Sequence, residues 1–412
     1  MPLPWLRRGA TSPDSSATPP AAYVLERSPF MSKSIAGEPM IEDNMRYTGD
    51  RRSVSSRHLP LSAAQNDLES RPSPYGPIQS GGTSMKSRPR VLQVGLGPIG
   101  RDTARRAAAR GYEVVGAVDI DPSMGGRSLS EVLEADIPGE VVGSVEDALE
   151  AFAMDAALVT TVSDLDKVVP DCETLLQGGV AVISTCEEMA YPLHTQPDAT
   201  GRLDEAAKAG GVACLGTGIN PGFVLDLLPA LVSAPLDRVE SVRAWRVVDA
   251  GTRRGPLQKK VGAGLTEEEF HARVKGGSFG HRGFMESLHM VCDAFDVDPR
   301  GATTFIRPVI CDADIDTGVV KVKAGQVAGI HQGAEDREGK VVLDLKMYVG
   351  AKEPGDRVEL AGDPPIKVQV EGGYMGDVAT CAIALNAVPA VLRAAPGFRT
   401  MLDLPALPAP RG

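Results

Sequence analysis

Residues 90–111 read RVLQVGLGPIGRDTARRAAARG, and this stretch decides the fold. An apolar, strand-like run leads into a turn that contains Gly95, Gly97 and Gly100, and a helical segment closed by Gly111 follows. In this GxGxxG pattern the first glycine allows the tight turn, the second lets the backbone approach a pyrophosphate, and the third permits close packing of helix on strand. The N-terminus of the helix offers free N–H groups to phosphates. The stretch therefore predicts a dinucleotide-binding unit.

An acidic residue stands where such a unit needs one. A second strand-like run, YEVVGAVD, ends in Asp119, 24 residues after Gly95 and close to the roughly 20 residues expected for a ribose-binding acid. A carboxylate there accepts hydrogen bonds from the ribose diol and repels a 2′-phosphate, which favours NAD. Arg127 lies nearby and could contact such a phosphate, so the sequence leaves NAD and NADP both open. The alternative is a packing turn without a ligand.

The pattern of strands and helices predicts an α/β protein. The runs DAALVTTV, GVAVIST and GVACLG alternate with helical segments, which indicates a parallel sheet with right-handed crossovers. After Pro235, closely spaced strand-like runs with Gly and Asp turns predict a mainly antiparallel sheet that two helical stretches interrupt. We expect a Rossmann-type domain over 88–234, an α+β substrate and oligomerisation domain over 235–375, and a C-terminal helix and tail over 376–412 that pack on the Rossmann domain.

Residues 1–87 differ from the rest of the chain, because they are rich in Ser, Pro, Arg and Gly and show no sustained apolar period. Such a segment buries too little surface to offset its ordering entropy, so we expect a disordered extension. Met85, just ahead of the first strand, is an alternative start, and a regulatory tail is another reading.

Composition and residue spacing argue against a nucleic-acid partner, a membrane span, disulfides and a metal site. The net charge of -11 without a dense basic run argues against nucleic acid, and no stretch approaches the roughly 20 apolar residues of a membrane span. Six scattered cysteines without a CxxC pair indicate reduced core residues of a cytoplasmic protein. No cluster of His, Cys or carboxylates has the spacing of a metal site.

Two adjacent carboxylates, Glu187 and Glu188, come just after the strand-like run GVAVIST. They stand in the stretch ISTCEEMAYP, residues 183–192, whose first three residues end that run. Ligands of open α/β sheets bind at the carboxyl ends of the strands, so this is a candidate catalytic position. Successive side chains of an extended segment face opposite ways, and one of the two should enter the pocket. The sequence does not choose between them. Solvated loop acids or a helix-start pair are the alternative, and Tyr191 is expected to line the same pocket.

Two further strand ends carry candidate contacts to the nicotinamide. Thr160, Thr161 and Ser163 follow one run, and their small side chains let a flat ring approach, although Ser163 could equally cap the next helix. In LGTGINPGF, Asn220 could bond the carboxamide or serve only the backbone turn. The candidate cofactor-binding residues are Gly95, Gly97, Pro98, Ile99, Gly100, Asp119, Thr161, Ser163 and Asn220.

Six motifs occur in order between Arg88 and Pro405: VGLGPIG, STCEEMAYP, GTGINPGFVLDLLP, PLQKKVGAGLTEEEF, GGSFGHRGFMES and GDVATCAIALNAVPAVLRAAPGFRTMLDLP. Together they resemble the dihydrodipicolinate reductase-like superfamily, and most closely the 2,4-diaminopentanoate dehydrogenase and native amine dehydrogenase family. The resemblance implies reversible oxidative deamination, in which an amine gives a hydride to NAD(P)⁺ and water releases ammonia. An amine or carbonyl substrate, ammonia and a homo-oligomer, expected to be a dimer, are implied as partners.

The resemblance also implies roles for residues. One glutamate of the CEE segment would hold the substrate ammonium, stabilise the iminium and shuttle the proton of the attacking water. Lys260, Gly264 and Thr266 resemble, loosely, the segment with which dihydrodipicolinate reductases bind a dicarboxylate. The paired histidines of that family are absent, so Lys260 and Thr266 stand as candidate substrate contacts or as loop-shaping residues. His281 is interpreted as a helix-cap or core residue. The alternatives to an amine dehydrogenase are an imine or C=C reductase and a non-catalytic dinucleotide-binding protein.

Overall fold

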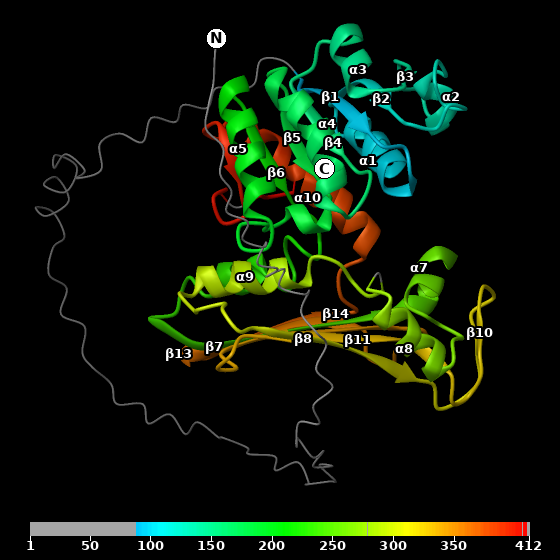
Figure 1. Ribbon diagram of the computed structural model, residues 1–412, viewed down its shortest axis with the longest axis vertical. Coiled ribbons are helices and arrows are strands. Elements are labelled where there is room, and N and C mark those ends of the chain that lie inside the picture. The colour runs from blue at the N-terminus through cyan, green and yellow to red at the C-terminus, as the bar shows by residue number, and fades with distance from the viewer. Residues whose placement is uncertain (1–87, 278, 406, 410–412) are drawn as a thin grey trace, which may run out of the picture. The chain divides into compact units, whose positions relative to one another are not determined.

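The computed structural model describes residues 88–277, 279–405 and 407–409. These residues belong to one compact unit that contains two large β-sheets (Figure 1). The disordered extension predicted over 1–87 lies outside the described residues.

The first sheet is the Rossmann-type sheet predicted from the glycine turn. Its seven strands run in the order β15-β6-β5-β4-β1-β2-β3, and every pairing is parallel. The strands are β1 (Arg90–Val94), β2 (Glu113–Val118), β3 (Val141–Val142), β4 (Ala156–Val159), β5 (Ala181–Ser184), β6 (Ala213–Gly216) and β15 (Gly397–Arg399). All residues of β4, β5 and β6 are buried, because helices cover both faces of the sheet.

Helices from distant parts of the chain cover this sheet. They are α1 (Pro98–Ala109), α2 (Leu129–Leu133), α3 (Val145–Ala151), α4 (Leu165–Gln177), α5 (Pro197–Gly210) and α10 (Gly376–Val391). On one face α10 packs beside α1, where Tyr112 Oη donates to the Leu385 carbonyl at 3.0 Å. The core on that face includes Leu158 and Ile183, while Val159 and Val182 pack on the opposite face with α4 and α5.

The second sheet has six strands in the order β14-β13-β7-β12-β11-β8. The strands are β7 (Arg238–Asp249), β8 (Thr303–Ile310), β11 (Val327–Glu335), β12 (Val341–Tyr348), β13 (Gly355–Asp363) and β14 (Ile366–Glu371). Only β7 and β12 pair in parallel, so the mainly antiparallel sheet expected from the sequence is confirmed. The helix α9 (Phe284–Ala294) and the short α6 (Leu227–Val232) pack on one face of this sheet.

Smaller elements gather at one end of the second sheet. They are the 3-10 turn η2 (Ala250–Thr252), α7 (Gly255–Lys260), α8 (Glu267–Lys275), and the hairpin of β9 (Ile315–Asp316) and β10 (Lys321–Val322) (Figure 1).

Each of the six cysteines is buried and free of disulfides, as expected. Within the described ranges no helix is long and apolar enough to cross a membrane.

Candidate functional site

The glycine turn has the geometry that a dinucleotide requires. Gly95 adopts the left-handed region with φ +87°, and a Cβ added at Gly100 would lie 1.9 Å from the Gly95 carbonyl oxygen. A Cβ added at Gly97 would meet no described atom within 4 Å. The first and third glycines are therefore required by the turn itself, whereas the second faces open space at the N-terminus of α1. A pyrophosphate fits this cradle.

Asp119 ends β2 and lies against the same turn. Its Oδ2 accepts from the Leu96 amide at 2.7 Å, and its Oδ1 accepts from the Asp121 amide at 2.9 Å. The carboxylate is thereby fixed beside the turn while remaining partly exposed. Arg127, the alternative phosphate contact, donates to Glu131 Oε1 at 2.6 Å.

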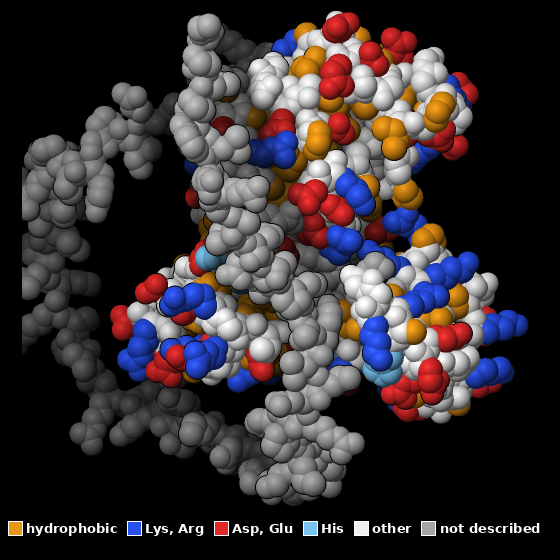
Figure 2. Space-filling model, in the orientation of Figure 1, with side chains coloured by type: hydrophobic (Ala, Val, Ile, Leu, Met, Phe, Trp, Pro, Cys, Tyr) orange, Lys and Arg blue, Asp and Glu red, His pale blue; other side chains and the backbone are white. Residues whose placement is uncertain are grey.

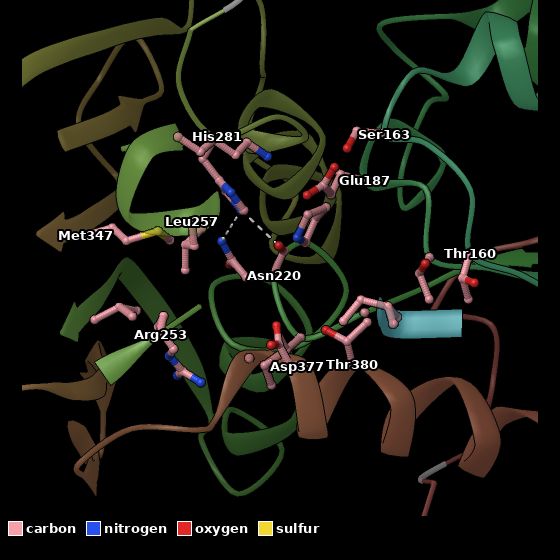
Figure 3. Close-up of a pocket in the computed structure, with 18 of the residues that line it drawn as sticks. Thr160, Ser163, Glu187, Asn220, Arg253, Leu257, His281, Met347, Asp377 and Thr380 are labelled. Carbon is pink, nitrogen blue, oxygen red and sulfur yellow. Dashed lines mark hydrogen bonds between the residues drawn. The ribbon is translucent and has the colours of Figure 1, made fainter. Parts of the chain in front are cut away.

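A cavity of about 340 Å³ opens where the carboxyl ends of β4, β5 and β6 meet residues of the second sheet (Figure 3). It gathers side chains from both halves of the described chain. Six of the predicted site residues line it: Ile99, Thr161, Ser163, Glu187, Asn220 and Lys260. Binding sites at the ends of parallel strands are the rule in open α/β sheets.

The two acids of the CEE segment have different surroundings. The expectation of an extended segment was wrong, since they begin the 3-10 turn η1 (Glu187–Met189), where successive side chains lie about 120° apart. Glu188 turns away: its Oε2 accepts from the Leu165 amide at 2.9 Å at the N-terminus of α4, and its Oε1 pairs with Arg282 at 2.6 Å. Glu187 lines the cavity, and its buried Oε2 has no hydrogen-bond partner among the described residues.

Asn220 and His281 form the wall beside Glu187 (Figure 3). His281 Nε2 lies 3.0 Å from Asn220 Nδ2 and 2.9 Å from the Asn220 carbonyl oxygen. Asn220 is 8% exposed, and its Oδ1 is buried with no partner in the part of the chain that the structure describes. Gln332 of β11 holds the backbone of His281 through bonds of 2.8 and 3.0 Å.

Burial lowers the pKa of His281 below its ordinary value of 6.5; Glu187 opposes this shift and Lys260 adds to it. The imidazole is therefore neutral at neutral pH. Interpreting His281 as a helix-cap residue was wrong, because Gly283 holds the N-cap position of α9. The available signal was the pair of glycines around it: Gly280 and Gly283, with φ values of +120° and +75°, shape the loop that leads into α9, and His281 lies in that loop two residues before the N-cap.

Four cations line the cavity, and only Lys260 was expected from the sequence. Arg246 is buried, pairs with Asp356 at 3.1 Å and donates to the Tyr374 carbonyl at 2.8 Å. The others come from the turn after β7 and from α7: Arg254 pairs with Asp377 at 3.0 Å, while Arg253 and Lys260 form no ion pair with any residue that the structure describes. Arg253 and Arg254 come just after β7 and the three residues of η2, and this position near a strand end was the only signal for them in the sequence.

Tyr191 and Thr266 lie outside the cavity lining. Tyr191 is buried, and its hydroxyl donates to Asp293 Oδ2 at 2.6 Å. Thr266 begins α8 with a capping box, in which its Oγ1 accepts from the Glu269 amide and Glu269 Oε2 accepts from the Thr266 amide. Their contact with a substrate stays a prediction.

Comparison with known proteins places the chain in a family. The model of the 2,4-diaminopentanoate dehydrogenase C-terminal domain matches residues 223–411. A 2,4-diaminopentanoate dehydrogenase from Acetoanaerobium sticklandii is 32% identical over 328 residues, which are 77% of this chain and 93% of that relative. The chain belongs to the 2,4-diaminopentanoate dehydrogenase family.

Other similar proteins agree with this family. An amine dehydrogenase from Streptomyces virginiae is 22% identical over 352 residues, or 76% of this chain and 96% of the relative. The solved structure of an amine dehydrogenase from Mycobacterium smegmatis has the same fold, with a TM-score of 0.68 and 24% identity over 79% of this chain and 98% of that chain. Membership in the 2,4-diaminopentanoate dehydrogenase family confirms the resemblance seen in the six motifs, the oxidoreductase class and the NAD-binding Rossmann fold.

Proposed function

We propose that the chain catalyses NAD(P)-dependent oxidative deamination of an amine or diamino acid, and reductive amination in reverse, with Glu187 as the catalytic carboxylate. The observation that carries the proposal is the pair of buried, unpartnered acceptors Glu187 Oε2 and Asn220 Oδ1 in one cavity. Buried polar atoms are normally hydrogen-bonded, and an ammonium has three donors and no acceptor. A substrate amine supplies the donors that these two oxygens lack.

The cofactor is expected to bind across the carboxyl ends of the strands of the first sheet. The glycine turn would hold the pyrophosphate, Asp119 the ribose diol, and Thr161 and Ser163 the nicotinamide end, while Asn220 binds the substrate amine instead of the carboxamide contact expected from the sequence. When bound, the dinucleotide supplies the hydride acceptor. We favour NAD over NADP, because Asp119 repels a 2′-phosphate and Arg127 is paired with Glu131. A higher kcat/KM with NAD⁺ than with NADP⁺ is the expected result.

Glu187 has three tasks in this proposal. As the amine binds, the carboxylate balances the ammonium charge, accepts its surplus proton and passes that proton to solvent, so that Glu187 is ionised again before the hydride leaves. After hydride loss it lies beside the iminium and stabilises that charge. It then takes a proton from the water that attacks the iminium carbon, which gives a carbinolamine that releases ammonia and leaves the carbonyl product. His281 stays neutral beside it and fixes Asn220.

The acid pair offers a matched test. Glu187→Gln keeps the shape of the side chain but removes its charge and its basicity, so amine-dependent NADH formation should fall about 10²–10⁴-fold. Glu188→Gln can still accept from the Leu165 amide and loses only a partly exposed ion pair with Arg282, so turnover should stay within about fivefold.

The assay follows NADH and NADPH formation over a panel of amines that includes 2,4-diaminopentanoate, with cofactor affinity of each variant as the control. Near-normal turnover in Glu187→Gln would contradict the proposed role. Ammonia dependence in the reductive direction separates an amine dehydrogenase from an imine or C=C reductase.

A further inference from the structure

One ring nitrogen of His281 faces two groups of opposite character (Figure 3). Its Nε2 lies 2.9 Å from the Asn220 carbonyl oxygen, which only accepts hydrogen bonds, and 3.0 Å from Asn220 Nδ2, which only donates them. A ring nitrogen carries either a proton or a lone pair. Only one of the two contacts is therefore a hydrogen bond at any time, and the proton on Nε2 decides which one.

The backbone on both sides of this contact is fixed. Gln332 Oε1 accepts from the His281 amide at 2.8 Å, and Gln332 Nε2 donates to the His281 carbonyl at 3.0 Å. In the loop that carries Asn220, the Gly222 amide donates at 2.7 Å to Asp226, which is 1% exposed. The carbonyl of Asn220 thus stays in place beside the ring, and the side-chain amide is the group that can turn.

The two ends of the Asn220 amide have different surroundings. Nδ2 faces the ring, while Oδ1 is buried and has no partner among the described residues. With a lone pair on Nε2, Nδ2 donates to the ring and Oδ1 is left for the amine. With a proton on Nε2, two donors would face each other at 3.0 Å. Turning the amide over removes this conflict, because Oδ1 and the carbonyl then share the Nε2 proton, and Nδ2 takes the former place of Oδ1.

Charged groups from three elements act on the ring. Burial is the largest effect and lowers the pKa of His281, Glu187 of η1 raises it, and Lys260 of α7 and Arg246 of β7 lower it. Lys260 and Arg246 keep their charge in weak acid, so Glu187 is the neighbour that can titrate together with the ring. A bound ammonium adds another positive charge, and amine binding and protonation of His281 therefore oppose each other.

We propose that His281 is a positioning residue, and that the proton on its Nε2 decides which end of the Asn220 amide faces the substrate. The proposal rests on the proposed function, which assigns the acceptor for the amine to Asn220. In weak acid a donor replaces that acceptor, so amine binding is weakened. A carbonyl compound needs a donor instead of an acceptor, so its binding is strengthened by the same change.

The test compares two ligands with the same carbon skeleton, 2-aminopentane and 2-pentanone. Each is titrated calorimetrically into the NADH complex between about pH 7.5 and pH 5, without ammonia, so that neither is turned over. As the pH falls, the dissociation constant of 2-aminopentane should rise about tenfold and that of 2-pentanone should fall at least about twofold, as expected for one hydrogen bond. The amine stays protonated throughout, because alkylammonium groups lose their proton only at much higher pH.

Two histidine variants separate this effect from other titrating groups. His281→Gln offers Nδ2 an acceptor but takes up no proton, so both affinities should change much less with pH. His271→Gln is the matched control, because His271 belongs to α8, lies outside the cavity lining and has a side chain that is 47% exposed. Figure 2 shows a histidine side chain (pale blue) at the surface over α8. This variant should keep the response of the wild type.

A second readout needs neither amine nor ketone. In the NADH complex labelled with ¹⁵N at histidine and asparagine, the chemical shift of His281 Nε2 should indicate a lone pair at about pH 7.5 and a proton in weak acid. The shift of Asn220 Nδ2 should change with the same midpoint, because its acceptor is lost. His281→Gln and Asn220→Ala identify the two sets of signals by their absence.

A proton on Nε2 at every pH, or an Nδ2 signal that does not follow Nε2, would overturn the proposal. A loss of amine affinity that His281→Gln shares would also overturn it. If amine affinity falls but 2-pentanone binds no more tightly, the ring acts through its charge alone and the turning of the amide is wrong. If neither ligand binds but the two signals titrate together, the proposed function fails and the coupling of His281 to Asn220 stands.

Discussion

The glycines of the turn differ in what an added side chain would meet. Gly97→Val introduces carbon atoms into open space at a backbone φ of -62°, so the fold should be kept. Those atoms would occupy the approach of the pyrophosphate, and the dissociation constant for NADH should rise at least tenfold. Fluorescence titration of NADH, together with the melting temperature, measures both effects.

Gly100→Ala provides the matched comparison. Its Cβ would lie 1.9 Å from the Gly95 carbonyl oxygen, so the helix or the turn must move. We expect a lower melting temperature, with a loss of stability of about 1–3 kcal/mol, which is the usual cost of overpacking. Equal changes in melting temperature and in NADH affinity for Gly97→Val and Gly100→Ala would contradict the separate roles of these glycines.

His281 should make the stability of the protein sensitive to acid. Its pKa in the folded protein is below 6.5, its ordinary value, so the unfolded chain takes up the proton first as the pH falls. The stabilising contribution of the neutral ring is complete above about pH 6.5 and is lost as the pH falls through that value towards the folded-state pKa.

Replacing His281 with Gln removes the titrating group from the cavity wall. We expect the free energy of unfolding of His281→Gln to fall less between about pH 7.5 and pH 5.5 than that of the wild type. Urea denaturation at the two pH values gives the comparison, and identical losses would mean that His281 does not contribute. If the free energy of unfolding of His281→Gln differs from that of the wild type by the same amount at both pH values, the difference reflects packing only.

Some of these residues could be found from the sequence and others could not. Glu187 and Glu188 were visible because they follow a buried strand. The choice between them depends on Arg282, which lies 94 residues away and pairs with Glu188. Arg253 was missed for a similar reason, since its position in the cavity depends on how the turn after β7 faces the first sheet.

At the scale of elements, the cap of α8 can be tested by itself. Thr266→Ala removes the side-chain acceptor for the Glu269 amide, which should lower the free energy of unfolding by about 1 kcal/mol and leave the KM for the amine unchanged. Chemical denaturation and steady-state kinetics provide the two readouts. A higher KM would instead support the substrate contact predicted from the sequence.

Local patterns predicted the elements with a strong apolar signal and missed those whose own sequence is typical of turns or too short to carry a pattern. The apolar runs of β4, β5 and β6 and the helical period of α1 were strong local signals. The helix α7 begins at Gly255 and contains Pro256, both typical of turns, and it was not expected. The three-residue strand β15 was also missed, because it is defined by its pairing with β6 rather than by its own sequence. The parallel pairing of β7 with β12 likewise cannot be predicted from local sequence patterns, because it joins strands that are far apart in the chain.

At the scale of the whole described unit, the C-terminal segment should contribute to stability. Met401 is 2% exposed in the core of the first sheet, and its sulfur accepts from Thr217 Oγ1 at 3.1 Å. Met401→Ala should therefore cost about 2–5 kcal/mol of unfolding free energy. Its neighbour Leu402 is 36% exposed, and Leu402→Ala should cost much less.

Urea denaturation of the two alanine variants measures this difference, and equal losses would show that the segment is not part of the core. Because Thr217 directly precedes the cavity-lining loop that contains Gly218 and Asn220, Met401→Ala should also weaken NADH binding.

The strand β15 has a consequence for how the protein is made. Synthesis runs from the N-terminus, and about 180 residues separate the end of β6 from the beginning of β15. At roughly 5–20 residues per second, a ribosome needs about 10–35 seconds to cover that distance. Throughout this interval the nascent chain carries β6 as an open edge, with backbone groups that another chain can pair with. A transcript cut short before Gly397 yields a polypeptide whose first sheet ends at β6 instead of β15.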